Sequence, residues 1–187
     1  LVSAGLGFAQ ESERVSWASV VLEATTEMGY YQYSAERALG KPDVPPGSGD
    51  SPNAWMPGRD KKTEYIKVGF EDPFRIRQIA IAETFNPSAI AEVYVYDKND
   101  NEFLIYEFDP RPLGIPERML HIFFELTDFE VAAVKIVLDG KAVPGFYAID
   151  AIAISNSIVE ITQEVNITES AIVNAEPDST WQSVSIR

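Results

Sequence analysis

The stretch IAEVYVYDKNDNEFLIYEF, residues 90–108, decides the fold. Apolar and polar residues alternate in Ile90–Tyr96, and a second run rich in apolar residues covers Glu102–Phe108. A period of two is typical of a half-buried β-strand. The polar residues Asp97–Asn101 between the runs have the length and composition of a hairpin loop. The stretch therefore predicts two antiparallel strands joined by a five-residue turn.

Similar runs lie on both sides of this hairpin. They are short, alternating or solidly apolar, and end at clusters of turn residues. The five runs are Glu64–Phe70, Arg75–Glu83, His121–Leu126, Val131–Leu138 and Ala148–Ile154. At least seven short strands predict an all-β protein, a β-sandwich or a barrel. Helix is scarce: Ala18–Met28 could form a short helix or a strand, and Ser34–Leu39 a single turn capped by Ser34 and ended by Gly40.

Composition excludes several classes of function. The chain has 187 residues, no Cys, one His, and a net charge of -14 from 15 basic and 29 acidic residues. The missing Cys excludes disulfide scaffolds and thiolate chemistry, and a Ser-His-Asp site would depend on His121 alone. Such negative charge disfavours nucleic acid and anionic lipid as partners. No apolar run is long enough to span a membrane, and we expect a protein that is not an enzyme.

The two ends of the chain differ from its middle. Leu1–Gln10 is apolar, with small residues before Gln10, and is expected to be the remnant of a signal peptide. Alternatively, it is an apolar N-terminus. Residues 15–156 form the predicted β-domain, and residues 157–187 an extra strand or a linker to a downstream domain. An exported, Cys-free, acidic chain suggests the periplasm, outer membrane or cell surface of a Gram-negative bacterium.

Several segments in the predicted β-domain match a known pattern in order. Tyr33–Asp43 resembles "SAxxALGxPD", Ser51–Pro57 "AWxP", and Ile79–Ala89 "IxIxETxNPGA" with Ser88 in place of Gly. Glu64–Phe70 and the two closing strands, Val134–Leu138 and Tyr147–Ile154, match as well. Together they resemble galactose-binding-like, discoidin-type (F5/8 type C-like) domains. Within that group the chain is similar to the N-terminal module of exported Bacteroidetes envelope proteins of the OmpA family.

The resemblance implies an antiparallel jelly-roll β-sandwich with one or two short helices. Members of this group mostly bind sugars, lipids or proteins through loops at one end and do not catalyse. The expected function is a non-catalytic binding module that contacts a glycan or an envelope protein. The alternative is a structural module that docks on its own downstream domains or on an envelope complex.

Six residues are the candidate ligand contacts: Trp55, Arg59, Glu83, Asn86, Lys141 and Tyr147. Trp55 lies in a loop rich in Pro and Gly, where it could stack on a sugar or bind a protein. Alternatively, it closes one end of the sandwich as part of the core. Arg59 begins a charged run that could equally be a solvated loop tip. Lys141 and Tyr147 lie at the turn between the two closing strands.

Glu83 and Asn86 lie at a strand end, where carboxylate and amide groups could bind a polyol or a hard cation. The alternative is a turn initiated by Asn86, with Glu83 bonded to backbone amides. A buried Glu83 would need a partner, for which Arg37 is the guess.

Other acidic residues bear on metal binding. No cofactor is certain, and a structural calcium ion is possible, although no spacing singles out Asp43, Asp50 or Asp72. Residues 97–108 lack the Gly and Glu of an EF-hand. Asp150, within an apolar strand, is expected to be a structural carboxylate bonded to a loop backbone.

Overall fold

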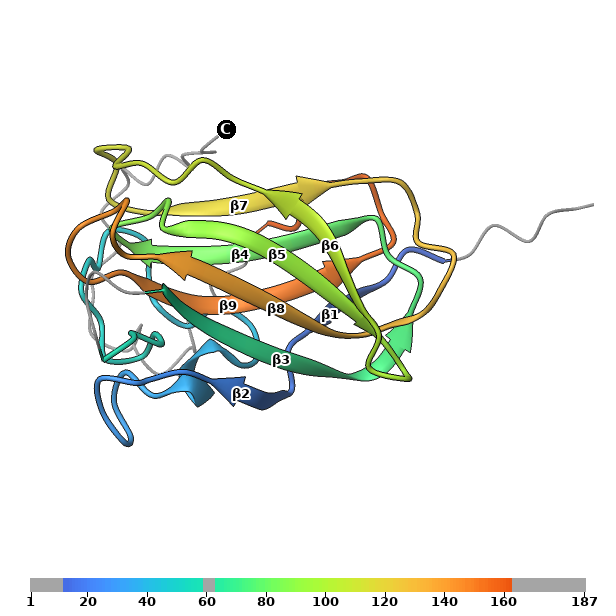
Figure 1. Ribbon diagram of the computed structural model, residues 1–187, viewed down its shortest axis with the longest axis horizontal. Helices are drawn as coiled ribbons and strands as arrows, with labels where there is room; N and C mark the ends of the chain where they lie inside the picture. Colours follow the sequence, from blue (N-terminus) through green and yellow to red (C-terminus); the bar gives the residue numbers. More distant parts are fainter. Residues whose placement is uncertain (1–11, 59–62, 163–187) are drawn as a thin grey trace, which may run out of the picture.

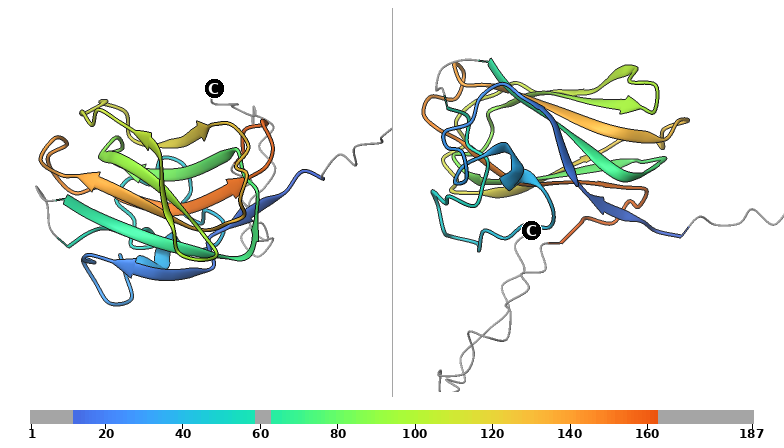
Figure 2. Two further views of the ribbon diagram at one scale, coloured as in Figure 1. Left: turned by 45° about the vertical axis from the view of Figure 1, so that its right-hand side comes forward. Right: turned by 90° about the horizontal axis from the view of Figure 1, so that it is seen from below.

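The protein is a sandwich of two antiparallel sheets, seen in a computed structural model that describes residues 12–58 and 63–162 (Figure 1). The four-stranded sheet has the order β1 (Val15–Trp17), β9 (Ala148–Ser155), β4 (Gln78–Phe85), β7 (Arg118–Phe123). The five-stranded sheet has the order β2 (Val20–Ala24), β3 (Thr63–Phe74), β8 (Val131–Asp139), β5 (Ile90–Asp97), β6 (Glu102–Glu107). Figure 2 shows the two sheets as separate layers. The expectation of an all-β fold is confirmed.

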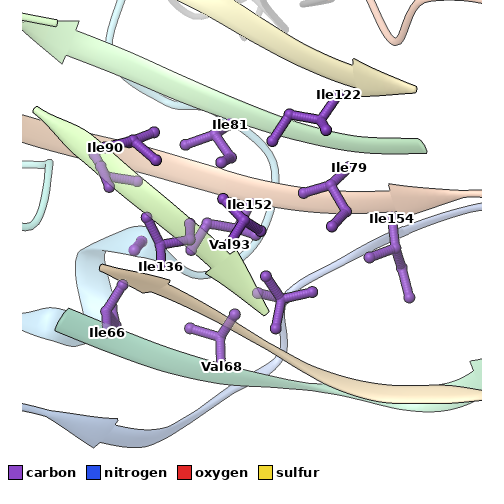
Figure 3. Close-up of a cluster of buried hydrophobic side chains, with 14 of the residues drawn as sticks. Ile66, Val68, Ile79, Ile81, Ile90, Val93, Ile122, Ile136, Ile152 and Ile154 are labelled. Atoms are coloured by element: carbon purple, nitrogen blue, oxygen red, sulfur yellow. The ribbon is translucent and has the colours of Figure 1, made fainter. Parts of the chain in front are cut away.

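The core lies between the layers and consists mainly of Ile and Val. Ile79 and Ile81 of β4 and Ile152 of β9 lie opposite Ile66 of β3 and Ile136 of β8 (Figure 3). All five side chains are fully buried. Burial of each such side chain contributes about 1.5–3 kcal/mol. The alternation read from the sequence therefore marks the faces that hold the sheets together.

Strands β4 and β9 are buried on both faces. All eight residues of β9 are buried, as are all but the last of β4. Their outer face carries Ala80 and Ala153, which pack with Ile161 beyond the end of β9. Small residues on that face let the following segment approach the sheet closely. The solid apolar runs in the sequence reflect this double coverage.

All seven predicted strands are present. The segment Ala18–Met28 forms a strand, β2, and not a helix. The predicted turn after Ser34 is the 3₁₀ helix η1 (Ala35–Ala38). Ser34 is the N-cap residue of η1, as predicted, but its side chain makes no capping hydrogen bond. The Ala35 N–H donates to the Glu27 carboxylate at 2.8 Å. Gly40, two residues beyond η1, has a φ of +80°, a conformation that favours glycine.

The hairpin between β5 and β6 forms as predicted. One oxygen of the Asp97 carboxylate accepts hydrogen bonds from the N–H groups of Asn99 and Asn101, at 2.8 and 3.0 Å. The other accepts one from the Asn101 amide at 2.8 Å. These bonds satisfy Asp97 within the turn.

The antiparallel topology gathers four connections at one end of the sandwich, on the left in Figure 1. They are the β2–β3, β4–β5, β6–β7 and β8–β9 loops, which we call the loop end. The β5–β6 hairpin lies at the opposite end. The predicted signal-peptide remnant (1–10) and residues 163–187 of the predicted linker lie outside the described residues. Within the described ranges, no helix is long and apolar enough to cross a membrane.

Candidate ligand-binding site

Trp55 belongs to the core. It lies in the β2–β3 connection, where its N–H and C=O bond the backbone of Ile149 at 2.8 and 3.0 Å. Its side chain is 0% exposed, and its indole N–H donates to the Thr26 carbonyl at 3.0 Å. Of the two sequence interpretations, the structure therefore supports the one in which Trp55 closes the end of the sandwich. No ligand can reach its ring in this conformation.

Glu83 is a buried structural carboxylate on β4. One oxygen lies 2.5 Å from Nε of Arg118 on the neighbouring strand β7, and the other accepts the Ser88 N–H at 2.7 Å. The guess that Arg37 is its partner is wrong. Arg37 instead donates from Nε to the Tyr31 carbonyl at 2.9 Å. Both oxygens of Glu83 therefore have partners, one on the neighbouring strand β7 and one in the β4–β5 turn.

Asn86 joins two loops of the loop end. Its side-chain N–H₂ donates to the carbonyls of Pro144 and Phe146 in the β8–β9 loop, at 3.2 and 3.0 Å. Its φ is +44°, in the left-handed region that Asn tolerates better than most residues. These contacts make Asn86 a structural residue of the turn, in agreement with the alternative interpretation from the sequence.

The remaining predicted contacts are divided between surface and interior. Lys141 is exposed, and its backbone N–H donates to the Asp139 carboxylate at 2.8 Å. Tyr147 is buried, whereas the neighbouring Phe146 is largely exposed. Arg59 lies outside the described residues. Among the predicted contacts that the structure describes, only Asn86 and Lys141 reach the surface.

Two tyrosines that the sequence analysis did not single out are the most exposed aromatic side chains among the described residues. Tyr30 and Tyr31 are 78% and 76% exposed, in the β2–β3 loop, the blue loop at the lower left of Figure 1. Their rings meet edge to face, with centroids 4.8 Å apart. We call this pair the tyrosine platform. The signal for it in the sequence was an aromatic doublet directly after Gly29, in a segment without strand alternation.

The loop that carries the platform is fixed at both ends. The Met28 N–H donates to the Met56 carbonyl, and the Tyr33 N–H to the Pro52 carbonyl, each at 2.9 Å. A Cβ atom on Gly29 would lie 2.4 Å from the Gln32 carbonyl oxygen, so only glycine fits this tight turn. These bonds fix the loop backbone, so the two tyrosine rings are exposed to solvent from a fixed position.

A cavity of about 480 Å³ lies beside the platform. Its polar lining comes from hydroxyl and carboxylate groups, and its apolar lining from β2 and η1. The lining residues are Val21, Ala24, Thr25, Thr26, Glu27, Tyr30, Tyr31, Ser34, Ala35 and Glu36. Ligand sites for small molecules and sugars have volumes in this range, with a few polar groups on an apolar wall.

Asp150 ties another part of the β2–β3 connection to the core. Its carboxylate accepts the Val44 N–H at 3.1 Å and the Asp43 N–H at 3.5 Å. It is 1% exposed, and this burial raises the pKa of the carboxyl to about 7. The expected bond to a loop backbone is present. Across residues 12–58 and 63–162, no group of three or more His, Cys, Asp or Glu side chains could hold a metal ion.

Comparison with known families gives one match. The model of the family described as "Pappalysin-1, SD scarf domain, C-terminal" matches residues 9–162. No curated protein matches the chain.

Solved structures with the same architecture include sugar-binding and other domains. A carbohydrate-binding module from Clostridium perfringens, in complex with GalNAc-β-1,3-galactose, has a TM-score of 0.51 at 16% identity, over 76% of this chain and 94% of that one. A pectin-binding carbohydrate-binding module has a TM-score of 0.55 at 15% identity, over 79% and 96% of the two chains. XRCC1 bound to the DNA polymerase β catalytic domain has a TM-score of 0.56 at 13% identity, over 75% and 97%. At these identities the likeness establishes the fold, a jelly-roll sandwich.

Proposed function

The chain belongs to the family of the pappalysin-1 C-terminal SD scarf domain, and from this premise we propose that it is a non-catalytic domain that binds carbohydrate at the tyrosine platform. The observation that carries the proposal is the exposure of Tyr30 and Tyr31 beside a cavity of about 480 Å³. Exposed aromatic rings on a fixed loop are costly to leave in water and mark interaction sites. A tyrosine ring offers an apolar face for the C–H face of a sugar and a hydroxyl for its polar rim.

The carbohydrate-binding modules among the structural neighbours support this proposal. One of them is in complex with GalNAc-β-1,3-galactose, and another binds pectin. These ligands belong to those proteins. For this chain they indicate that a sandwich of this shape can present a sugar site without catalytic machinery.

The absence of catalysis is also part of the proposal. A glycoside hydrolase uses two carboxyl groups on opposite sides of the bond it cleaves, one of them in an apolar pocket. Glu83 and Asp150, the buried carboxylates discussed above, are both bonded to protein groups. Glu27 and Glu36 line the cavity but are solvent-exposed. This arrangement favours binding over bond cleavage.

We further propose that the domain acts in the envelope of a Gram-negative bacterium, as an exported protein with a glycan or an envelope protein as its partner. The support is the composition: no Cys and a net charge of -14. Fractionation of the native host, followed by detection of the protein in the periplasm, outer membrane or cytoplasm, tests this location directly. Recovery in the cytoplasm would contradict it.

A saccharide screen tests the binding function. The wild-type domain should be stabilised against heat by at least one oligosaccharide, since a ligand of the folded state raises Tm. The double variant Tyr30→Ala/Tyr31→Ala should lose this shift and keep its own Tm. Tyr106→Ala is the matched control, because Tyr106 is an exposed tyrosine on β6. If no saccharide stabilises the wild type, the carbohydrate proposal fails and the scaffold alternative gains.

A further inference from the structure

We propose that the cavity beside the tyrosine platform selects sugars that carry a free ammonium group, such as glucosamine units, over neutral N-acetylated sugars and uronic acids. This inference rests on the proposed carbohydrate-binding function and names the class of sugar. It is argued from the hydrogen-bonding capacity of the cavity wall and from its charge.

The two threonine hydroxyls of the wall can offer a ligand only acceptor capacity. Thr25 and Thr26 both donate their hydroxyl protons to the same oxygen of the Glu64 carboxylate, the Thr26 bond being 2.9 Å long. The alternative acceptor for Thr25, the Tyr65 carbonyl, lies at 3.4 Å and also within the protein. A hydroxyl has one proton and two lone pairs. Because both protons are donated to Glu64, the two hydroxyls can offer a ligand in the cavity only their lone pairs.

Backbone donors fix these hydroxyls in place. The Tyr65 N–H donates to the Thr25 hydroxyl, and the Gly58 N–H to the Thr26 hydroxyl, each at 3.0 Å. Each oxygen therefore retains one lone pair for a ligand. Because the donors are backbone groups of two different segments, neither hydroxyl can turn its proton toward the cavity without breaking a bond.

The carboxylate behind the threonines, that of Glu64, is buried and pairs with no cation among residues 12–58 and 63–162. Glu64 is 2% exposed, and none of the ion pairs between described residues includes it. A buried charge of this kind favours a positive group nearby, because the surrounding protein screens it less than water does.

Two further carboxylates line the cavity itself. Glu27 and Glu36 are both in the lining, and the lining residues that the structure describes include no Lys, Arg or His. One oxygen of Glu27 accepts a hydrogen bond from the Ala35 N–H. This bond does not neutralise the carboxylate, so its negative charge remains at the cavity wall. The basic residue next to Glu36, Arg37, donates to the Tyr31 carbonyl and is not part of the lining.

An ammonium group meets both requirements of this wall. It has three N–H donors, no acceptor and a positive charge. An N-acetyl group replaces these donors with one N–H and a carbonyl oxygen, which would face lone pairs. A uronic acid adds a negative charge beside three carboxylates, in a protein whose net charge is already -14. The tyrosine platform can stack against the ring of any of these sugars, so the wall decides among them.

Calorimetric titration of the wild-type chain with three oligosaccharides of equal length tests the inference. They are a glucosamine oligomer, an N-acetylglucosamine oligomer and a galacturonic acid oligomer, at a pH where the amine is protonated. The glucosamine oligomer should bind roughly 10-fold more tightly than the acetylated one, since two exposed charge pairs contribute ~2- to 5-fold each. The preference should shrink in 1 M salt, which screens such pairs.

Charge-removing variants identify the groups responsible. Glu27→Gln and Glu36→Gln should each weaken glucosamine binding ~2- to 5-fold, and should weaken acetylated binding less, so that the preference for glucosamine shrinks. The glutamine at position 27 keeps an oxygen for the Ala35 N–H. Glu107→Gln, on the exposed surface of β6, is the matched control and should change neither affinity.

The outcomes separate this inference from the proposed function. If the acetylated oligomer binds as tightly as glucosamine, and the tyrosine variants abolish both, the domain binds sugars and the charge selection is wrong. If no oligomer binds, both the proposed function and this inference are wrong. If a lysine-rich peptide binds at the cavity and glucosamine oligomers do not, the ammonium comes from a protein and the sugar assignment is overturned.

Discussion

Glu83 and Arg118 lie directly opposite each other on strands β4 and β7, with the carboxylate oxygen 2.5 Å from Nε of the guanidinium group. The carboxylate is buried and the arginine partly exposed. The second oxygen of Glu83 bonds the Ser88 backbone, so the pair also anchors the β4–β5 turn. At the loop end, this carboxylate therefore stabilises the scaffold that carries the loops.

Removal of the Arg118 charge should destabilise the fold. Loss of one partner leaves a buried carboxylate without its cation, which typically costs about 3–5 kcal/mol. Because Arg118 is partly exposed, we expect Arg118→Met to lower the free energy of unfolding by about 2–3 kcal/mol in urea titrations. Lys98→Ala, which breaks the exposed pair of Lys98 with Glu130, is the control and should cost under about 1 kcal/mol. Equal effects of the two variants would contradict the structural role.

Substitution of Trp55 should affect stability and not ligand contact. Trp55→Phe removes the indole bond to the Thr26 carbonyl and some packing volume, and should cost about 1–3 kcal/mol. Trp55→Ala should cost about 3–5 kcal/mol. Chemical denaturation measures both. A Trp55→Phe variant of wild-type stability that has lost saccharide binding would show that the ring contacts the ligand after all.

Two variants of Asn86 separate its hydrogen bonds from its backbone conformation. Asn86→Gly removes the bonds to Pro144 and Phe146 but adopts a positive φ without strain, and should cost about 1–2 kcal/mol. Asn86→Ala adds about 1 kcal/mol or more for the left-handed backbone. The difference in unfolding free energy between the two variants measures this strain. An alanine variant more stable than the glycine variant would contradict it.

Gly29→Ala should disturb the tyrosine platform more than the core. The added Cβ would meet the Gln32 carbonyl at 2.4 Å, so the turn that carries Tyr30 and Tyr31 must move. We expect saccharide affinity to fall at least 10-fold while the Tm falls only by a few degrees. Gly114→Ala is a control, because it strains a positive φ in another loop but meets no atom within 4 Å. Unchanged affinity in Gly29→Ala would argue against the platform.

Stability should fall as the pH rises toward and through 7, because of Asp150. Burial raises the pKa of this carboxyl to about 7, well above its value of about 3.9 in an unfolded chain. The folded protein therefore holds the proton more tightly. Its stabilising contribution is complete at acidic pH and is lost between about pH 4 and 7.

The variant Asp150→Asn isolates this effect. It cannot ionise but keeps an oxygen for the Val44 N–H. The difference in unfolding free energy, variant minus wild type, should grow by a few kcal/mol from pH 5 to pH 8.5 in urea titrations. A constant difference over this range would show that Asp150 does not titrate there.

Local sequence determined the strands and some of the turns. Alternation and short apolar runs located seven strands, because a strand places successive side chains on opposite faces whatever its neighbours are. The Asp97 turn and the structural role of Asp150 also followed from local sequence. Asp97 finds its partners within four residues. A carboxylate in an apolar strand must bond something, although the bonded residues, Asp43 and Val44, were not predictable.

The tertiary structure alone decided which aromatic residues of the loops are exposed. Local sequence left open whether Trp55 is buried, and the tertiary structure shows that it is wholly buried whereas Tyr30 and Tyr31 are exposed. All three lie in the same long connection between β2 and β3. Trp55 is buried because its segment crosses to pair with Ile149 of β9, more than 90 residues away along the chain.

Pairing over long distances is also why Arg118, and not Arg37, faces Glu83. Residue types and their spacing determine which strands and turns form, because secondary-structure preferences act over a few residues. The register between distant strands depends on how the two sheets bury their apolar faces together. The sequence determined the sandwich and its loop end. Only packing decided the partners of the buried charges and the surface that the loops present.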